Sequence, residues 1–295
     1  MIVDDVDRHL HRLQISTRQA VNDLLAGEYL SVFRGRGVEF DEVREYQPGD
    51  DVRSIDWNVT ARTGVPHVKR FVEERELTMY FLVDMSASNR FGSDLKTKNE
   101  SAVELAALLA FSAVKNNDRV GLVLFTEEVE LYVAPSKGRR HVMRILRDLS
   151  TFRARHRGTN IRGALSFLNR VTTKSAVALL VSDFQADEYE SEMIEAARRH
   201  DLIAAIIRDP HEQDLPPVGL VQMRDAETGD VRVLDTSSLV VREAFRESVA
   251  AHRRELHSLL EELDVDYLDL MTGADHVAEL HGFFQTRLMK GMRHA

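Results

Sequence analysis

Three side chains that carry oxygen follow an apolar run at every second position. The stretch LVDMSASNR, residues 82–90, contains Asp84, Ser86 and Ser88 in this arrangement. In an extended segment these residues share a face, and in a loop that leaves a strand they can converge on one point. Carboxylate and hydroxyl oxygens suit Mg²⁺ or Mn²⁺ and are poor ligands for zinc or copper. The alternative is an ordinary polar turn, in which aspartate and serine are common.

Two further oxygens stand where they could join this group. Thr159, in HRGTNIRGAL (156–165), lies at an expected junction between a loop and a helix, and Asp183, in LLVSDF (179–184), ends a second apolar run. Alone, Thr159 reads as a helix N-cap and Asp183 as a turn residue. Together with the first three residues, they indicate a metal site.

The sequence contains few of the patterns that would indicate an enzyme. An aspartyl phosphatase of the haloacid-dehalogenase type has a second aspartate two residues after its nucleophile, and here that position is Ser86. The motifs G-x-S-x-G, H-E-x-x-H and G-x-x-x-x-G-K-[ST] are absent. A metal-dependent phosphohydrolase stays open as an alternative, and so does a scaffold whose metal site is structural or empty.

The elements that must position these residues alternate between strand and helix from residue 77 onward. This pattern predicts an α/β fold whose mostly parallel sheet is covered on both faces. Ligands of such sheets bind beyond the carboxyl ends of the strands, where the strand order reverses. Strands are expected at 77–84, 119–126, 129–133, 175–183, 201–209 and 265–270, helices at 98–115, 138–149, after Asn160, at 188–199, 239–262 and 275–289, and a hairpin around Gly229.

The first 76 residues divide into two parts of different character. Residues 4–25 have loose helical spacing and Gly27 offers a stop, so residues 1–30 are expected to form an N-terminal helix. Residues 31–76 are rich in turns and predict a β-rich element of short strands. Residues 77–295 then form the main domain. Within the β-rich element, the segment Pro48-Gly49-Asp50 is expected to turn and Trp57 to anchor the element.

The composition limits which classes of partner and which cellular compartment are expected. The chain has 295 residues, 43% of them hydrophobic, which is enough for a sizeable core. With 39 basic and 48 acidic residues, its net charge of −9 argues against nucleic acid or anionic lipid as the main partner. The absence of cysteine excludes disulfides, thiolate zinc sites and thiol nucleophiles. Without a long apolar run or a signal-peptide pattern, we expect a cytoplasmic protein, peripheral to the membrane only through its partners.

The five oxygen-bearing residues resemble the metal-ion-dependent adhesion site of von Willebrand factor A domains. The resemblance implies that Ser86, Ser88 and Thr159 are hydroxyl ligands of Mg²⁺ or Mn²⁺, and that Asp84 and Asp183 hold the ion directly or through waters. In this type of site, a carboxylate from a binding partner fills the vacant position. A group of arginines would favour the same acidic ligand, although such a group is more often a solvated surface: Arg153, Arg155 and Arg157.

Residues 34–76 are similar to the signature region of the bacterial DUF58 family, a domain of unknown function. The segment reads RGRGVEFDEVREYQPGDDVRSIDWNVTARTGVPHVKRFVEERE. The resemblance implies a small β-rich element beside a von Willebrand factor A-like domain. It also implies partnership with a MoxR-type AAA+ ATPase that assists the assembly or maturation of other protein complexes. The expected function is therefore a non-enzymatic, metal-dependent protein-binding adaptor. Its polar signature residues either hold the element together or dock on the ATPase: Asp50, Asp51, Arg53, Asp56 and Trp57.

Overall fold

The structure, a computed structural model, describes residues 17, 21, 25–33, 39–48, 50–72, 76–92 and 96–293. The chain divides into two compact units, one formed by residues 33–76 and the other by the remaining residues. Most of the helix expected over residues 4–25 lies outside the described residues. In the described part of the chain, no helix is long and apolar enough to cross a lipid bilayer.

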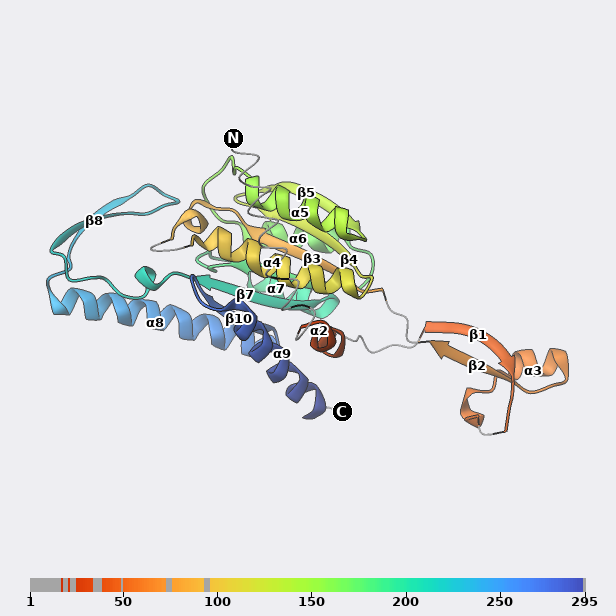
Figure 1. Cartoon of the computed structure of the whole chain (residues 1–295). Coiled ribbons are helices and arrows are strands. Elements are labelled where there is room, and N and C mark those ends of the chain that lie inside the picture. Colours follow the sequence, from red (N-terminus) through yellow and green to blue (C-terminus); the bar gives the residue numbers. More distant parts are fainter. Residues whose placement is uncertain are drawn as a thin grey trace. The chain divides into compact units, whose positions relative to one another are not determined.

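A six-stranded sheet forms the centre of the larger unit (Figure 1). The strand order is β10-β7-β6-β3-β4-β5, and only β5 runs antiparallel to its neighbour. Five of these strands end in the same direction, so their carboxyl ends share one edge of the sheet. The strands are β3 (Thr78–Asp84), β4 (Arg119–Phe125), β5 (Val129–Ser136), β6 (Val177–Ser182), β7 (Asp201–Arg208) and β10 (Asp266–Met271).

Helices cover both faces of this sheet, as the alternation of strands and helices predicts. On one face, α6 (Ile161–Val171), α7 (Glu190–Arg199) and α8 (Leu239–Glu262) contribute side chains to a continuous hydrophobic core. On the other face, α4 (Lys98–Lys115) contacts α5 (Arg139–Thr151) and α9 (His276–Arg293). Because it packs against the sheet and two helices, α4 is buried nearly all round, which explains its lack of a polar stripe.

Helix α2 (Ala26–Phe33) corrects the prediction that Gly27 ends a helix. Gly27 lies in its first turn, where a Cβ atom would meet nothing within 4 Å. Leu25, Tyr29 and Phe33 are buried at spacings of four residues, so their apolar stripe carries the helix past the glycine. Glu28 accepts hydrogen bonds from His281 and Gln285 of α9, which fixes α2 on the larger unit.

The smaller unit contains a helix that the turn-rich pattern did not predict. Strands β1 (Glu39–Glu45) and β2 (His67–Val72) pair antiparallel, and between them lie the 3₁₀ turn η2 (Val52–Ser54) and α3 (Trp57–Thr63). The Asp56 carboxylate caps α3 by accepting from the backbone N–H groups of Asn58 and Val59, and Gly64 ends it at φ 75°.

Polar contacts rather than the tryptophan hold the loop of this unit. The expected turn at Pro48 is present, since the Asp50 N–H bonds to the Gln47 carbonyl at 3.0 Å. The Asp50 carboxylate also accepts two hydrogen bonds from the Arg44 guanidinium, at 2.9 and 2.6 Å. Trp57 is 69% exposed, so the prediction that it anchors the unit is wrong. It stands at the first position of α3.

Candidate functional site

The order of strands reverses between β3 and β6. From β3 the chain moves outward to β4 and β5, whereas β6, β7 and β10 build the sheet in the opposite direction. Asp84 is the last residue of β3, and Asp183 follows Ser182, the last residue of β6. Because these two strands are neighbours, both carboxylates stand at the switch point, where open α/β sheets bind their ligands.

Asp84 is buried among hydrogen-bond donors. Its Oδ1 accepts from the Ser86 backbone N–H at 2.9 Å, and its Oδ2 accepts from the Ser182 hydroxyl at 2.7 Å. Burial, and next the negative charge of Asp183, raise the pKa of Asp84 to about 6, although these hydrogen bonds oppose the rise. Two carboxylates thus share a poorly solvated space that favours a cation. Ser182 was not among the residues predicted from the sequence.

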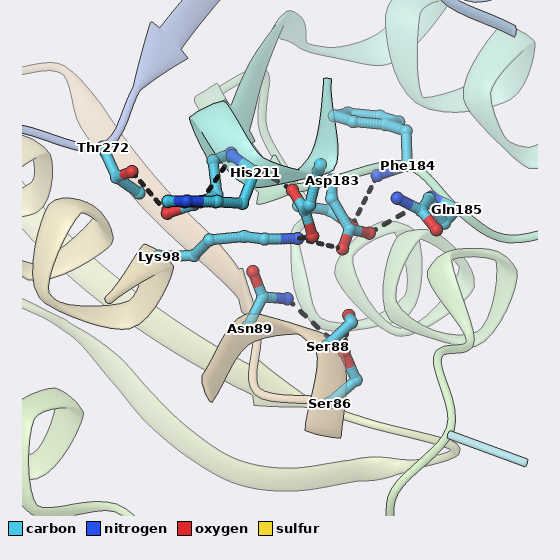
Figure 2. Close-up of polar contacts among 12 residues, drawn as sticks. Ser86, Ser88, Asn89, Lys98, Asp183, Phe184, Gln185, His211 and Thr272 are labelled. Atoms are coloured by element: carbon cyan, nitrogen blue, oxygen red, sulfur yellow. Dashed lines mark hydrogen bonds and ion pairs between the residues drawn. The ribbon is translucent and has the colours of Figure 1, made fainter. Parts of the chain in front are cut away.

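Ser86 and Ser88 lie in the turn that follows β3. Ser86 precedes the 3₁₀ turn η3 (Ala87–Arg90), is fully buried, and has its Oγ 3.0 Å from the Ser88 Oγ. The Asn89 amide donates to the Ser86 Oγ at 3.4 Å, as Figure 2 shows. The backbone N–H of Ala87 bonds to the carbonyl of Arg157, which ties this turn to the loop that carries Thr159.

The loop before α6 is held by two glutamates. Glu130 of β5 accepts from the backbone N–H of Arg155 at 2.8 Å, and Glu127 accepts from that of Gly158 at 3.1 Å. These bonds present the Thr159 hydroxyl 3.4 Å from Asp84 Oδ2. Asn160, not Thr159, caps α6. The N-cap alternative for Thr159 is therefore wrong, and its hydroxyl is available to the site.

Asp183 has a partner that the sequence did not reveal. Lys98, at the start of α4, is fully buried, and its Nζ lies 2.8 Å from Asp183 Oδ2 and 2.5 Å from Glu212 Oε1. Figure 2 shows its side chain reaching Asp183. Burial lowers the pKa of Lys98, but the two carboxylates outweigh it and hold the pKa above its usual value. The only local feature of the sequence that could have indicated this ion pair was a lysine in a helix that is otherwise apolar nearly all round.

A carboxylate from a distant hairpin also enters the site. Strands β8 (Leu220–Arg224) and β9 (Val231–Asp235) pair antiparallel, and Glu227 lies in the turn between them. Its Oε1 accepts from the Thr159 hydroxyl at 2.8 Å. Burial is the main cause that raises the pKa of Glu227, with Asp183 adding to it, while hydrogen bonds with Thr159, Ser88 and Ser86 oppose the rise. The sequence predicted this hairpin but not where its tip lies.

The three arginines of the loop do not act as one group. Arg157 donates through Nε and Nη2 to the carbonyl of Ala226, at 3.1 and 2.7 Å, so it holds the hairpin tip. The side chains of Arg153 and Arg155 are exposed, and Arg155 contributes its backbone N–H to Glu130. Of the three arginines, Arg157 is therefore the one whose side chain contacts the hairpin tip at the site.

The oxygen donors fit a hard divalent cation. Asp84, Ser86, Ser88 and Thr159 are connected by contacts of 2.9 to 3.4 Å, and Asp183 acts on Asp84 through its charge. In the part of the chain that the structure describes, no three His, Asp or Glu side chains form a metal-binding group by themselves. Hydroxyl oxygens would have to supply the remaining ligands, and they favour Mg²⁺ or Mn²⁺ over softer metals.

Comparison with known families gives one clear match. The model of the family described as "Protein of unknown function DUF58" matches residues 42–255. Uncharacterized proteins of Mycobacterium tuberculosis and Mycobacterium bovis are each 34% identical to this chain over 283 residues, which are 94% of this chain and 88% of theirs. The uncharacterized protein YeaD of Bacillus subtilis is 30% identical over 108 residues, 37% of this chain and 25% of its own.

Solved structures show a more distant likeness. A conserved hypothetical protein BatB from Bacteroides thetaiotaomicron aligns with a TM-score of 0.49 at 14% identity, covering 72% of this chain and 98% of its own. An aerotolerance-related membrane protein from Bacteroides fragilis aligns with a TM-score of 0.48 at 15% identity, covering 72% of this chain and 99% of its own.

Proposed function

The chain belongs to the DUF58 family of proteins of unknown function, and from this premise we propose that it is a non-enzymatic, cation-dependent protein-binding module. The observation that carries the proposal is the convergence of oxygen donors from three segments at the switch point of the sheet. Asp84 and Ser86 come from the end of β3, Thr159 from the loop before α6, and Asp183 from the end of β6.

The finer proposal is a von Willebrand factor A-like domain with a metal-ion-dependent adhesion site. Ser86, Ser88 and Thr159 would hold Mg²⁺ or Mn²⁺ through hydroxyls, and Asp84 and Asp183 directly or through waters. When bound, the ion supplies an electron-poor position that attracts a hard anionic oxygen. Because both aspartates are buried, few competing water molecules weaken that attraction.

The proposed partner is a MoxR-type AAA+ ATPase, its client protein, or both. This part of the proposal rests on the resemblance of residues 34–76 to the DUF58 signature. The partner contributes an acidic side chain to the cation, and the module acts as an adaptor in the assembly or maturation of other complexes. The net charge of −9 disfavours nucleic acid as a competing ligand.

The proposal is tested by removing two hydroxyl ligands without changing the charge. We expect Ser86→Ala combined with Ser88→Ala to weaken Mg²⁺ binding at least tenfold in calorimetry, and to abolish EDTA-sensitive capture of the cognate AAA+ ATPase. Ser166→Ala, an exposed serine of α6, is the matched control and should bind as the wild type does. Capture that persists in EDTA and in the double variant would contradict the proposal. Mg²⁺-dependent phosphoester turnover that the double variant loses would favour a phosphohydrolase instead.

The second candidate is a scaffold in which no metal binds, and Lys98 is the observation that favours it. An ammonium group already neutralises part of the negative charge of Asp183 and Glu212. Calorimetry distinguishes the two candidates. Binding of Mg²⁺ or Mn²⁺ in the presence of acetate, which stands in for the partner's carboxylate, supports the module, whereas no binding under these conditions supports the scaffold.

A further inference from the structure

The candidate site already holds a carboxylate that comes from this chain. Thr159 Oγ1 lies 2.8 Å from Glu227 Oε1 but 3.4 Å from Asp84 Oδ2. A hydroxyl has one proton, so the shorter contact indicates that Thr159 donates to Glu227. Glu227 thus contacts a hydroxyl of the candidate cation site.

A second contact holds Ala226, the residue before Glu227. The Arg157 guanidinium donates two hydrogen bonds to the carbonyl of Ala226, at 2.7 and 3.1 Å. Bonds from a charged donor are stronger than those between neutral groups. Two consecutive residues of the hairpin tip are therefore bound, one through its backbone by Arg157 and one through its carboxylate by the Thr159 hydroxyl.

The turn itself aims Glu227 at the site. Asp225 Oδ1 accepts from the backbone N–H groups of Glu227 and Thr228, at 2.8 and 2.9 Å. The Gly229 N–H bonds to the Asp225 carbonyl at 3.0 Å, and Gly229 has φ 80°, a conformation that favours glycine. These bonds lie within the turn, so the tip keeps its shape whether or not it is docked.

The two arms of the hairpin are held much less firmly than its tip. Leu220 of β8 is 76% exposed and Val233 of β9 is 64% exposed. Among the helices and strands that the structure describes, β8 and β9 pack extensively only against each other. The base is fixed by the buried Thr236, whose hydroxyl donates to the Gly219 carbonyl and accepts from the Val218 N–H. Figure 1 shows the hairpin as an arm on the side to which the parallel strands point. Such an arm can leave the site by breaking only the few contacts of its tip.

We propose that the β8–β9 hairpin is a built-in competitor, in which Glu227 occupies the position that a partner's carboxylate takes. The proposal rests on the proposed function and adds what regulates the site. It also specifies the partner's chemistry, namely an acidic side chain on an exposed turn, preceded by a free backbone carbonyl for Arg157. A partner that offers this pattern can form the same contacts with Thr159 and Arg157 as the hairpin tip does. The hairpin then leaves the site.

The docked state is tested by measuring the distance between two labels. The chain has no cysteine, so Ser166→Cys on α6 and Gln222→Cys on β8 place spin labels at exposed positions without background. We expect a narrow distance distribution in the otherwise wild-type chain and a broad one with Glu227→Ala or Arg157→Ala. Asp230→Asn is the matched control, since Asp230 is an exposed acid of the same turn, and it should leave the distribution narrow. Equally broad distributions with and without Glu227→Ala overturn the proposal.

Competition is tested with the synthetic peptide RDAETGDV, residues 224–231 of this chain. In Mg²⁺, we expect the peptide to bind the Glu227→Ala chain at least tenfold more tightly than the wild type or Asp230→Asn. Equal binding to wild type and Glu227→Ala, or none to either, overturns the competition.

The same titration separates this inference from the proposed function. Peptide binding that needs Mg²⁺ but does not improve in Glu227→Ala leaves the metal-dependent module intact and removes the competitor. Binding that improves in Glu227→Ala but is indifferent to Mg²⁺ and to Ser86→Ala keeps the competitor and contradicts the metal-dependent module.

Discussion

Lys98 shows how a single residue changes the electrostatics of the candidate site. A lysine without exposure to water is tolerated only when its charge is paired, and here Asp183 and Glu212 provide the pairing. Because the ammonium holds Asp183 from one side, an incoming cation meets less negative charge than five oxygen-bearing residues suggest. The position of Lys98 therefore bears on the stability of the protein and on the proposed binding of a cation.

Replacing Lys98 by methionine should strongly destabilise the larger unit. The change leaves the buried Asp183 and the partly exposed Glu212 without their partner. Breaking a buried ion pair from one side typically costs about 3–5 kcal/mol of unfolding free energy. Urea denaturation followed by circular dichroism measures this. Lys96→Met is the control, because Lys96 pairs with Glu104 at a partly exposed position, where about 0–1 kcal/mol is expected. Mg²⁺ should raise the unfolding midpoint of Lys98→Met more than that of the wild type. An unchanged midpoint for Lys98→Met would contradict the structural role.

His200 is a buried histidine that the structure keeps neutral. Its Nδ1 accepts from the Ala176 backbone N–H at 3.3 Å, and its Nε2 lies 3.2 Å from the Thr172 hydroxyl, which itself donates to the Leu168 carbonyl. Protonation would turn the Nδ1 acceptor into a donor that faces another donor. Burial, with the nearby charge of Arg199, lowers the pKa of His200 to about 4.

Stability should therefore fall as the pH drops, and His200 should account for a measurable part of the loss. Above the ordinary histidine pKa of about 6.5, both the folded and the unfolded chain hold His200 neutral, so its contribution is complete. Below that pH the unfolded chain takes up the proton first, which lowers the free energy of unfolding. This loss continues until the pH falls to the folded pKa of about 4, below which the folded chain is protonated as well. Between pH 7 and 5 the loss is about 2 kcal/mol.

Urea denaturation at several pH values tests this expectation. His200→Asn keeps an acceptor for the Ala176 N–H but does not titrate in this range, so its stability should fall about 2 kcal/mol less than that of the wild type between pH 7 and 5. Parallel profiles for the two proteins would show that His200 does not contribute.

At the level of elements, the sequence predicts the larger unit well. Its four central strands, β3, β4, β6 and β7, are runs of mostly buried apolar residues, and the structure places all six strands within a few residues of their expected bounds. Helix α4 begins and ends where the pattern indicates, at Lys98 and Lys115. These predictions succeed because strands buried on both faces and helices packed on a sheet have unambiguous hydrophobic patterns.

The smaller unit and α2 are less predictable, for a physical reason. Short elements contain few periodic positions, so turn residues dominate the pattern and hide them. Helix α3 has seven residues, and its clear signals are the capping Asp56 and the terminal Gly64. For the same reason, too few periodic positions, the sequence pattern predicted that Gly27 ends a helix and that Trp57 anchors the smaller unit.

Pairs of residues far apart in the sequence could not be predicted from one chain. Lys98 and Asp183 are 85 positions apart, and Thr159 and Glu227 are 68 apart. Neither the lysine nor the glutamate belongs to a recognisable motif, because each acts through tertiary packing alone. The spacing of Asp84, Ser86 and Ser88 was informative because those residues share one turn.

For the whole molecule, topology decides where the candidate site lies. A parallel sheet that reverses its strand order leaves the carboxyl ends of two neighbouring strands uncovered at the point of reversal. Asp84 and Asp183 stand at these two ends. The sequence predicted that the polar residues would follow strands, and the sheet order explains why strands distant along the chain bring them together.

The division into two units predicts unfolding that does not occur in one step. Among the described side chains of residues 33–76, Phe33 and Val68 are buried, whereas Val52, Trp57 and Val65 are exposed. A unit of this size that buries few of its described apolar side chains has marginal stability, whereas the larger unit has an extensive core. The smaller unit should therefore unfold at a lower urea concentration.

The only tryptophan of the chain makes this measurable. Trp57 lies in the smaller unit, so its fluorescence reports that unit, while far-ultraviolet circular dichroism is dominated by the helices of the larger unit. We expect the fluorescence transition to precede the dichroism transition, and iodide to quench the folded protein efficiently because the indole is 69% exposed. Lys98→Met provides the control, since it should move the dichroism transition and leave the fluorescence transition in place. Two transitions that coincide at every urea concentration, and shift together in this variant, would show that the units fold as one.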